Sequence, residues 1–180
     1  MIMFFKRLVK KYNAYKFVKS LQSKLEDDSF GFSDIDQKTI GCIVDESWCE
    51  NDVLKDRLAL LFNVNRAKIT LLSIDTQVED DYASTVAIKA LTPNSKSIID
   101  HPEVNFFIDK PFRILIQLYT ADDIRIQWIS AHTKSSFRIG LGTNNPRLCD
   151  LIINMDSYSC NEVLKEIEKY TSRLDVLKNE

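Results

Sequence analysis

The segment TIGCIVDESWCENDVLKDRLALLFNVNRAKITLLSID, residues 39–75, decides the fold class. It opens with an almost continuous apolar run, Thr39 to Asp45, whose length suits a β-strand buried on both faces. It closes with a second such run, Lys68 to Asp75. The residues between them repeat at the spacing of one helix face, at Val53, Leu54, Arg57, Leu58, Leu61 and Phe62. Strand, helix and strand in this order predict a βαβ unit with a right-handed crossover.

Three later apolar runs also suit strands, at Phe112–Tyr119, Phe137–Leu141 and Leu151–Met155. Strands that alternate with helices predict a mostly parallel sheet covered on both faces. With 180 residues, of which 44% are hydrophobic, the chain fits one domain of ordinary size. The expected fold is therefore a Rossmann-like three-layer α/β sandwich, formed by residues 39–180.

The segment between the second and third predicted strands, residues 76–111, carries Pro93 and Pro102 and no sustained period. We expect an irregular excursion with a short strand near Val86–Ala90 and a second candidate strand at VNFFID, residues 104–109. The later stretch TADDIRIQWISAHTKSS alternates partly like a strand, but its spacing favours a helix that Thr120 or Asp122 would cap.

The last segment predicts a capped helix most clearly. Ser159 and, three residues on, Glu162 form the pattern of a capping box. Apolar residues then follow at helical spacing, at Val163, Leu164, Ile167, Tyr170, Leu174 and Leu177.

The start of the chain differs from the rest in charge. Residues 1–25 contain seven lysines and arginines and no acid, whereas the remaining residues carry a net charge of −9. Apolar residues recur there at steps of three or four, which predicts a basic amphipathic helical arm. Its apolar face holds Phe4, Leu8, Tyr12, Tyr15, Val18 and Leu21, and Phe5, Val9 and Phe17 widen that face. The acidic stretch EDDSFGFSDIDQK, residues 26–38, then predicts a linker.

Three interpretations of the basic arm compete. Its apolar face would pack on its own domain or on another protein, including a second copy, because an apolar helical stripe in a soluble protein usually meets protein. It would alternatively lie on an anionic membrane surface, as Phe4, Phe5 and the single sign of charge suggest. Nucleic acid is the weakest interpretation, since the acidic body would repel the same phosphates. We expect a protein partner or self-association.

The four cysteines, Cys42, Cys49, Cys149 and Cys160, form no CxxC pair, and the chain has two histidines. A structural zinc site is therefore not expected, and no cofactor is implied. No apolar run approaches the roughly 20 residues of a membrane span. The chain begins with apolar residues before basic ones, the reverse of a secretory signal. We expect a cytoplasmic protein with reduced thiols.

Ligands of open α/β sheets bind beyond the carboxyl ends of the strands, near a switch in strand order. The loop GLGTNN after Phe137–Leu141 is the first candidate, with Gly140, Gly142, Thr143 and Asn144 forming a backbone nest for an anion. G-x-G is a weak pattern that lacks the third glycine of a dinucleotide site and the lysine of a P-loop. The favoured interpretation is a turn between two strands.

Carboxylates form the second candidate. Asp45, Glu46 and Asp122 follow predicted strands and could serve a metal or acid–base chemistry, although capping of the next helix explains the same residues. Arg138, inside the strand before the glycines, is a candidate to reach an anion. These eight residues are the candidate ligand-binding residues. No catalytic residue is identified, and whether the protein is an enzyme stays open.

Most of the chain resembles a known family. The segments KTIGCIVDES, KITLLSID, FRILIQLYTADD and SSFRIGLGTNNPRLCDLIINM occur in the order seen in an uncharacterised family of small bacterial proteins, known chiefly from Bacteroidetes, which has a basic N-terminal helix and a capped C-terminal helix. FRIGL is the most specific match, whereas VNFFIDKPF departs from the family pattern. The resemblance implies a Rossmann-like fold and brings no activity or catalytic residue.

A more distant likeness concerns the layout of FRILIQLYTADD and FRIGL, which is similar to the acceptor half of two-domain heptosyltransferases. It implies an alternative function, a small-ligand-binding or transferase-like protein related to glycosyl- or formyl-transferases. Those enzymes bind the nucleotide sugar with a second Rossmann-like domain, for which 180 residues leave no room. The likeness thus supports the fold more than the activity, and a non-catalytic interaction protein is the expected function.

Overall fold

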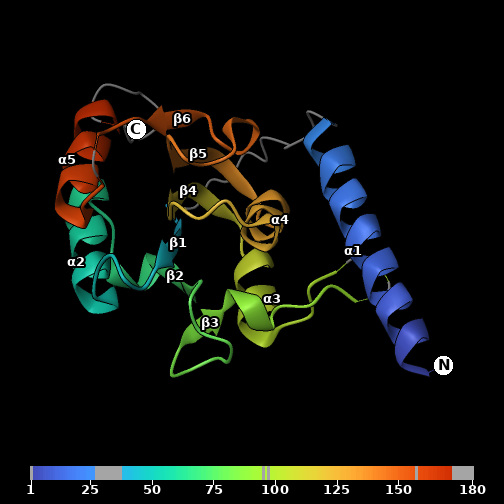
Figure 1. The fold of residues 1–180 in the computed structure, drawn as a ribbon. Coiled ribbons are helices and arrows are strands. Elements are labelled where there is room, and N and C mark those ends of the chain that lie inside the picture. Colours follow the sequence, from blue (N-terminus) through green and yellow to red (C-terminus); the bar gives the residue numbers. More distant parts are fainter. Residues whose placement is uncertain (1, 27–37, 95, 97, 157, 172–180) are drawn as a thin grey trace.

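A computed structural model describes residues 2–26, 38–94, 96, 98–156 and 158–171, with the side chains of the first helix described from Lys11 onward. Its centre is a six-stranded sheet in the order β3-β2-β1-β4-β5-β6 (Figure 1). The strands are β1 (Ile40–Asp45), β2 (Ile69–Asp75), β3 (Thr85–Ala87), β4 (Phe112–Leu118), β5 (Ser135–Leu141) and β6 (Leu151–Ile153). The helices are α1 (Ile2–Glu26), α2 (Asn51–Phe62), α3 (Pro102–Ile108), α4 (Ile124–His132) and α5 (Cys160–Thr171).

Every strand pair in the sheet is parallel. Ile40 of β1 lies in register with Ile69 of β2 on one side and with Ile114 of β4 on the other. The chain winds outward from β1 first through β2 and β3, and then returns to add β4, β5 and β6. The predicted βαβ unit and the Rossmann-like three-layer fold are confirmed.

Two apolar cores lie on the two faces of the sheet. Residues of one strand alternate between them, so that Cys42 and Val44 face the core under α2 and α5, while Ile43 faces the core under α3 and α4. Figure 1 shows α2 and α5 on one side and α3 and α4 on the other. Because the central strands are buried on both faces, their sequences are apolar at almost every position.

Helix α1 lies outside α4, on the same side of the sheet (Figure 1). The Phe17 ring stacks on Trp128 of α4 with a centroid separation of 6.0 Å, and Leu21 and Leu25 are buried beside it. The predicted apolar face was wrong for Tyr12 and Tyr15, whose exposed fractions are 59% and 65%. A helix that packs on another helix buries a narrow row at steps of four, and among the side chains described, from Lys11 onward, the row that meets α4 begins at Phe17.

Two further predictions were wrong in detail. Residues 104–109 were expected as a strand, but Pro102 occupies the first turn of α3, where its missing N–H costs nothing and its fixed φ favours the helix. Helix α4 is capped by Asp123, whose side chain accepts a hydrogen bond from Arg125 N at 2.8 Å, and not by Thr120 or Asp122. The predicted strand near Val86 is present as β3 and gives way to a 3₁₀ turn at Ile88–Ala90.

The C-terminal helix begins as predicted. Ser159 Oγ accepts a hydrogen bond from Glu162 N and donates one to the Glu162 carboxylate at 2.8 Å. Val163, Leu164 and Ile167 are buried, whereas Tyr170 is 38% exposed. The expected continuation of this helix at Leu174 and Leu177 lies outside the described residues. Residues 27–37 of the predicted linker also lie outside them. Within the described part of the chain, no helix combines the length and the apolar character needed to cross a membrane.

Candidate functional site

The strand order reverses between β1 and β4, so the loops after these two strands flank the place where doubly wound sheets bind ligands. Of the predicted residues, Asp45 ends β1 and Glu46 follows it, while Asp122 lies after β4. Gly140 lies near the end of β5, and Gly142, Thr143 and Asn144 follow that strand. Because β1, β4 and β5 run parallel, their carboxyl ends lie at the same edge of the sheet, where these residues were expected. Their side chains, however, bond mainly to groups nearby in the fold.

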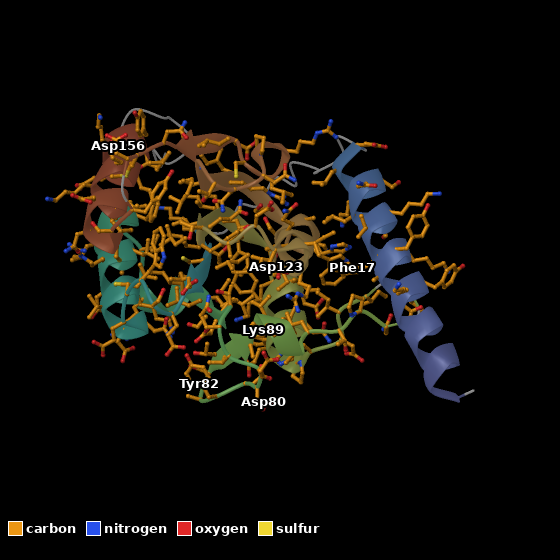
Figure 2. All side chains as sticks on the ribbon, viewed as in Figure 1. Phe17, Asp80, Tyr82, Lys89, Asp123 and Asp156 are labelled. Atoms are coloured by element: carbon orange, nitrogen blue, oxygen red, sulfur yellow. The ribbon has the colours of Figure 1, made fainter. Side chains whose placement is uncertain are left out.

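Asp45 closes a turn. Its Oδ1 accepts hydrogen bonds from Ser47 N at 3.0 Å and from Ser47 Oγ at 2.6 Å, while Trp48 N donates to the Asp45 carbonyl. Asp122 is exposed and accepts a hydrogen bond from Gln127 Nε2 at 2.7 Å. Asp123 beside it holds Arg125 and caps α4 (Figure 2). The carboxylates after β1 and β4 thus serve the turn and the helix start.

Glu46 belongs to a network that sequence reasoning missed. Its carboxylate accepts a hydrogen bond from Thr85 Oγ1 at the start of β3. Tyr82 lies in the loop before β3 (Figure 2), and its hydroxyl donates to Asp75 at 2.9 Å. The hydrogen bond with Glu46, together with Asp75, raises the pKa of Tyr82. The network braces the loop between β2 and β3 across the ends of three strands.

A hydrogen-bonded pair, His101 and Asp81, lies next to this network. His101 Nε2 is 2.7 Å from Asp81 Oδ2, and Asp81 Oδ1 accepts from Ala87 N at 2.8 Å. The hydrogen bond from His101 is the largest influence on Asp81 and lowers the pKa of its carboxyl. The other ring nitrogen, Nδ1, is buried and has no hydrogen-bond partner among the described residues. The pair thus ties the loop before β3 to the residue that precedes α3.

A groove of about 640 Å³ opens beside Glu46, between the start of α2, the edge of β2 and the start of α3. Four carboxylates line it, and Lys55 is the one basic residue among its lining residues. Glu46, Glu50, Asp52 and Glu103 supply the negative charge. Ser73 Oγ, at the wall formed by β2, donates a hydrogen bond to Asn51 Oδ1 at 2.8 Å. The groove is acidic and suits a cationic occupant better than a phosphate.

The glycine loop forms the short connection between β5 and β6, which run parallel with only a 3₁₀ turn at Pro146–Leu148 between them. Asn144 is buried, and its Oδ1 accepts from Leu141 N while its Nδ2 donates to the Tyr119 carbonyl at 3.0 Å. Gly142 N donates to the Ile153 carbonyl at 2.9 Å. Thr143 is exposed at the turn. Through these hydrogen bonds the loop links the ends of β4, β5 and β6.

Arg138 lies away from the glycine loop. Its guanidinium donates to Ser135 Oγ at 2.8 Å and to the Thr133 carbonyl at 2.7 Å, toward the amino end of β5. The side chain is 6% exposed, and burial lowers the pKa of the guanidinium. A cation at this place satisfies the carbonyl of Thr133, the C-cap residue of α4, and interacts favourably with the negative end of the helix dipole.

Metal ligands do not gather in the described part of the chain, where no group of three His, Cys, Asp or Glu side chains could hold an ion. The eight predicted site residues therefore divide into separate local roles. The acidic groove is open to a partner at this edge of the sheet. Of the residues that line it, only Glu46 was among the candidates from the sequence.

The strand order, the parallel pairing and the helices on both faces define a doubly wound α/β protein. The chain belongs to a family of unknown function, DUF6913, whose model matches residues 10–174. Neither the curated proteins nor the solved structures include a significant match to this chain. The match confirms the expected resemblance to an uncharacterised family, and it brings no activity with it.

Proposed function

We propose that this protein is a non-catalytic interaction protein that assembles with a second copy through the outward face of α1. The observation that carries the proposal is the exposure of two tyrosines among lysines on a helix that is already fixed to its own domain. Phe17, Leu21 and Leu25 hold the helix against α4, so the opposite face is free to meet a partner.

The outward face of α1 is both aromatic and basic. Tyr12 and Tyr15 are exposed, as are Lys11, Lys16 and Lys19. The Lys16 ammonium lies 5.3 Å from the centroid of the Tyr12 ring, which keeps the charge and the aromatic surface together. Tyrosine is enriched in protein interfaces because its ring provides contact area at a low cost in conformational entropy.

A second copy offers the complementary surface. The groove beside Glu46 carries four carboxylates and one lysine, and the body of the protein after residue 25 has a net charge of −9. Opposite charge on the two surfaces favours a head-to-tail contact, in which the helix of one copy meets the groove of the next. An anionic membrane is supported less well, because the buried row at Phe17, Leu21 and Leu25 is not available for insertion.

Sedimentation velocity of the full chain tests the proposal. At low salt, about 20 mM, the average mass should rise with concentration, and about 500 mM salt should reverse it because screening weakens the charge contact. Lys16→Glu combined with Lys19→Glu should give a monomer. Glu50→Lys combined with Glu103→Lys should do the same. An equimolar mixture of the two variants should associate again, since each arm then meets a groove of opposite charge.

Lys165→Glu, at an exposed lysine of α5, is the matched control and should leave self-association unchanged. A wild-type chain that stays monomeric at low salt contradicts the proposal. Loss of binding to anionic vesicles or to a single-stranded oligonucleotide in the arm variant, with no change in oligomeric state, would instead assign the helix to a membrane or to nucleic acid.

We also propose that the protein acts in the cytoplasm. Its four cysteines are all free, which suits a compartment that keeps thiols reduced.

A further inference from the structure

Two loops that are far apart in the sequence lie side by side between α2 and α5. The Trp48 ring, after β1, stacks on the Tyr158 ring, before α5, with centroids 6.1 Å apart. Further along, Arg57 in the middle of α2 donates a hydrogen bond to Asn161 in the first turn of α5. Figure 1 shows the two helices next to each other. The loops are therefore held together at two points.

Two cysteines are close in sequence to these contact residues. Cys49 follows Trp48, Cys160 precedes Asn161, and both belong to the apolar cluster under α2 and α5. The stacked rings and the Arg57–Asn161 hydrogen bond bring the neighbouring residues 49 and 160 together in one cluster. The Cys49 side chain is near enough to influence the pKa of Cys160. Cys42 of β1 lies near both of them and is completely buried. All of these cysteines are reduced in the structure.

We propose that Cys49 and Cys160 are a redox modification site, which forms a reversible disulfide when the protein meets a peroxide. The bond would link the loop after β1 to the start of α5. The site goes beyond self-association through α1. Because Cys49 lines the groove that the arm of another copy would cover, the redox test is made at about 500 mM salt, where that charge contact is screened.

The accessible thiol of the pair begins the reaction. Cys49 is partly exposed and lines the acidic groove, whereas Cys160 is 8% exposed. The Cys49 thiolate attacks the peroxide O–O bond, which breaks to give a sulfenic acid on Cys49 and an alcohol, or water when the oxidant is hydrogen peroxide. The Cys160 sulfur then attacks the sulfenic sulfur, its proton leaves with the hydroxide as water, and the disulfide forms.

The neighbouring groups favour Cys160 as the second thiol. Burial, followed by the hydrogen bond with Cys49, raises the pKa of Cys160 to about 12, so this thiol is a poor first nucleophile. Reduction follows from exchange with a small thiol, which returns both cysteines to the starting state.

Cys149 provides an internal control. It packs with the core under α4, on the other face of the sheet, where Gln117 Nε2 lies 3.4 Å from its sulfur. The sheet separates this thiol from Cys49 and Cys160. Cys149 should therefore keep its thiol under conditions that oxidise the pair.

Thiol titration and mass spectrometry of the full chain test the site. After treatment with about 1 mM hydrogen peroxide, two of the four thiols should be lost, the mass should fall by about 2 Da, and dithiothreitol should restore both. Peptide mapping should recover a cross-link between residues 49 and 160. Cys49→Ser and Cys160→Ser should each abolish the cross-link, while Cys149→Ser should leave it intact.

Peptide mapping of the wild-type chain decides the matter even if a variant fails to fold. Four titratable thiols after treatment, a cross-link through Cys42, a disulfide between two copies, or an irreversible sulfinic acid on Cys49 would each overturn the proposal.

Discussion

Close packing requires glycine at positions 140 and 142. Backbone conformation does not, because none of the described glycines has a positive φ. A Cβ on Gly140 would lie 2.3 Å from Cys149 Sγ and 2.9 Å from Asn144 Oδ1. A Cβ on Gly142 would lie 2.1 Å from Asn154 Oδ1. The sequence marks both residues as special, but it does not distinguish a phosphate nest from a crowded strand connection.

Gly140→Ala should therefore destabilise the protein by about 1–3 kcal/mol, the usual cost of forcing an extra methyl into a packed site. Urea denaturation followed by circular dichroism measures the change. Adding Cys149→Ala to the same chain should recover part of the loss, because the nearest overlapping atom is removed. A Gly140→Ala chain as stable as wild type would show that the neighbours yield without strain.

His132 gives the protein a pH-dependent stability. Its ring stacks on Trp128 at 3.9 Å, and its Nδ1 bonds to the Trp128 carbonyl. Burial is the main influence and lowers the pKa of His132, with a further contribution from Lys24 of α1. The unfolded chain then takes up a proton at a higher pH than the folded protein does. Stability from this residue is present above the ordinary value of about 6.5 and is lost as the pH falls through the folded pKa.

The free energy of unfolding should accordingly decrease as the pH is lowered from about 7 toward 5, and His132→Gln should flatten this decrease. Urea denaturation at a series of pH values gives both slopes. Between about pH 7.5 and 8.5, where histidines no longer titrate, the slopes of wild type and variant should agree. Equal slopes in the acidic window would remove His132 as the cause.

At the scale of elements, periodicity predicted α1 and its length better than the direction it faces. The sequence offers apolar and aromatic residues on several sides of the helix, and burial of Phe17 rather than Tyr15 follows from where Trp128 lies (Figure 2 labels Phe17). Residues 104–109 show the same difficulty. A short apolar run suits a strand or a helix equally by composition, and Pro102 with the spacing of buried Val104 and Phe107 decides for the helix.

Phe17→Ala should cost about 3–5 kcal/mol, because it removes a buried ring and leaves a cavity against Trp128. Tyr15→Ala is the matched control on the same helix, and its effect should stay within about 0.5 kcal/mol, since its side chain is exposed. Denaturant unfolding monitored by tryptophan fluorescence measures both. Similar losses for the two variants would mean that α1 does not pack as described.

At the scale of the whole molecule, the strand order determines which loops meet. Glu46, which follows β1, and Thr85 of β3 come together because β1, β2 and β3 are consecutive in the sheet and β3 pairs with the last residues of β2. The acidic groove collects residues from two helices, one strand and two loops. The two thiols of the proposed redox site, Cys49 and Cys160, meet because α2 and α5 share one face of the sheet.

The sequence by itself determined the α/β class, the parallel sheet, the strands β1, β2, β4, β5 and β6, the capped helix α5 and the basic arm, because each rests on a local period or a local cap. Four of the predicted site residues, Asp45, Glu46, Asp122 and Asn144, could also be located near strand ends from the sequence. Only the tertiary structure decided what their side chains bond to, which row of α1 is buried, and which cysteines are neighbours. Those relations depend on contacts between residues up to about a hundred positions apart, and nothing in a local pattern encodes which distant group will stand opposite.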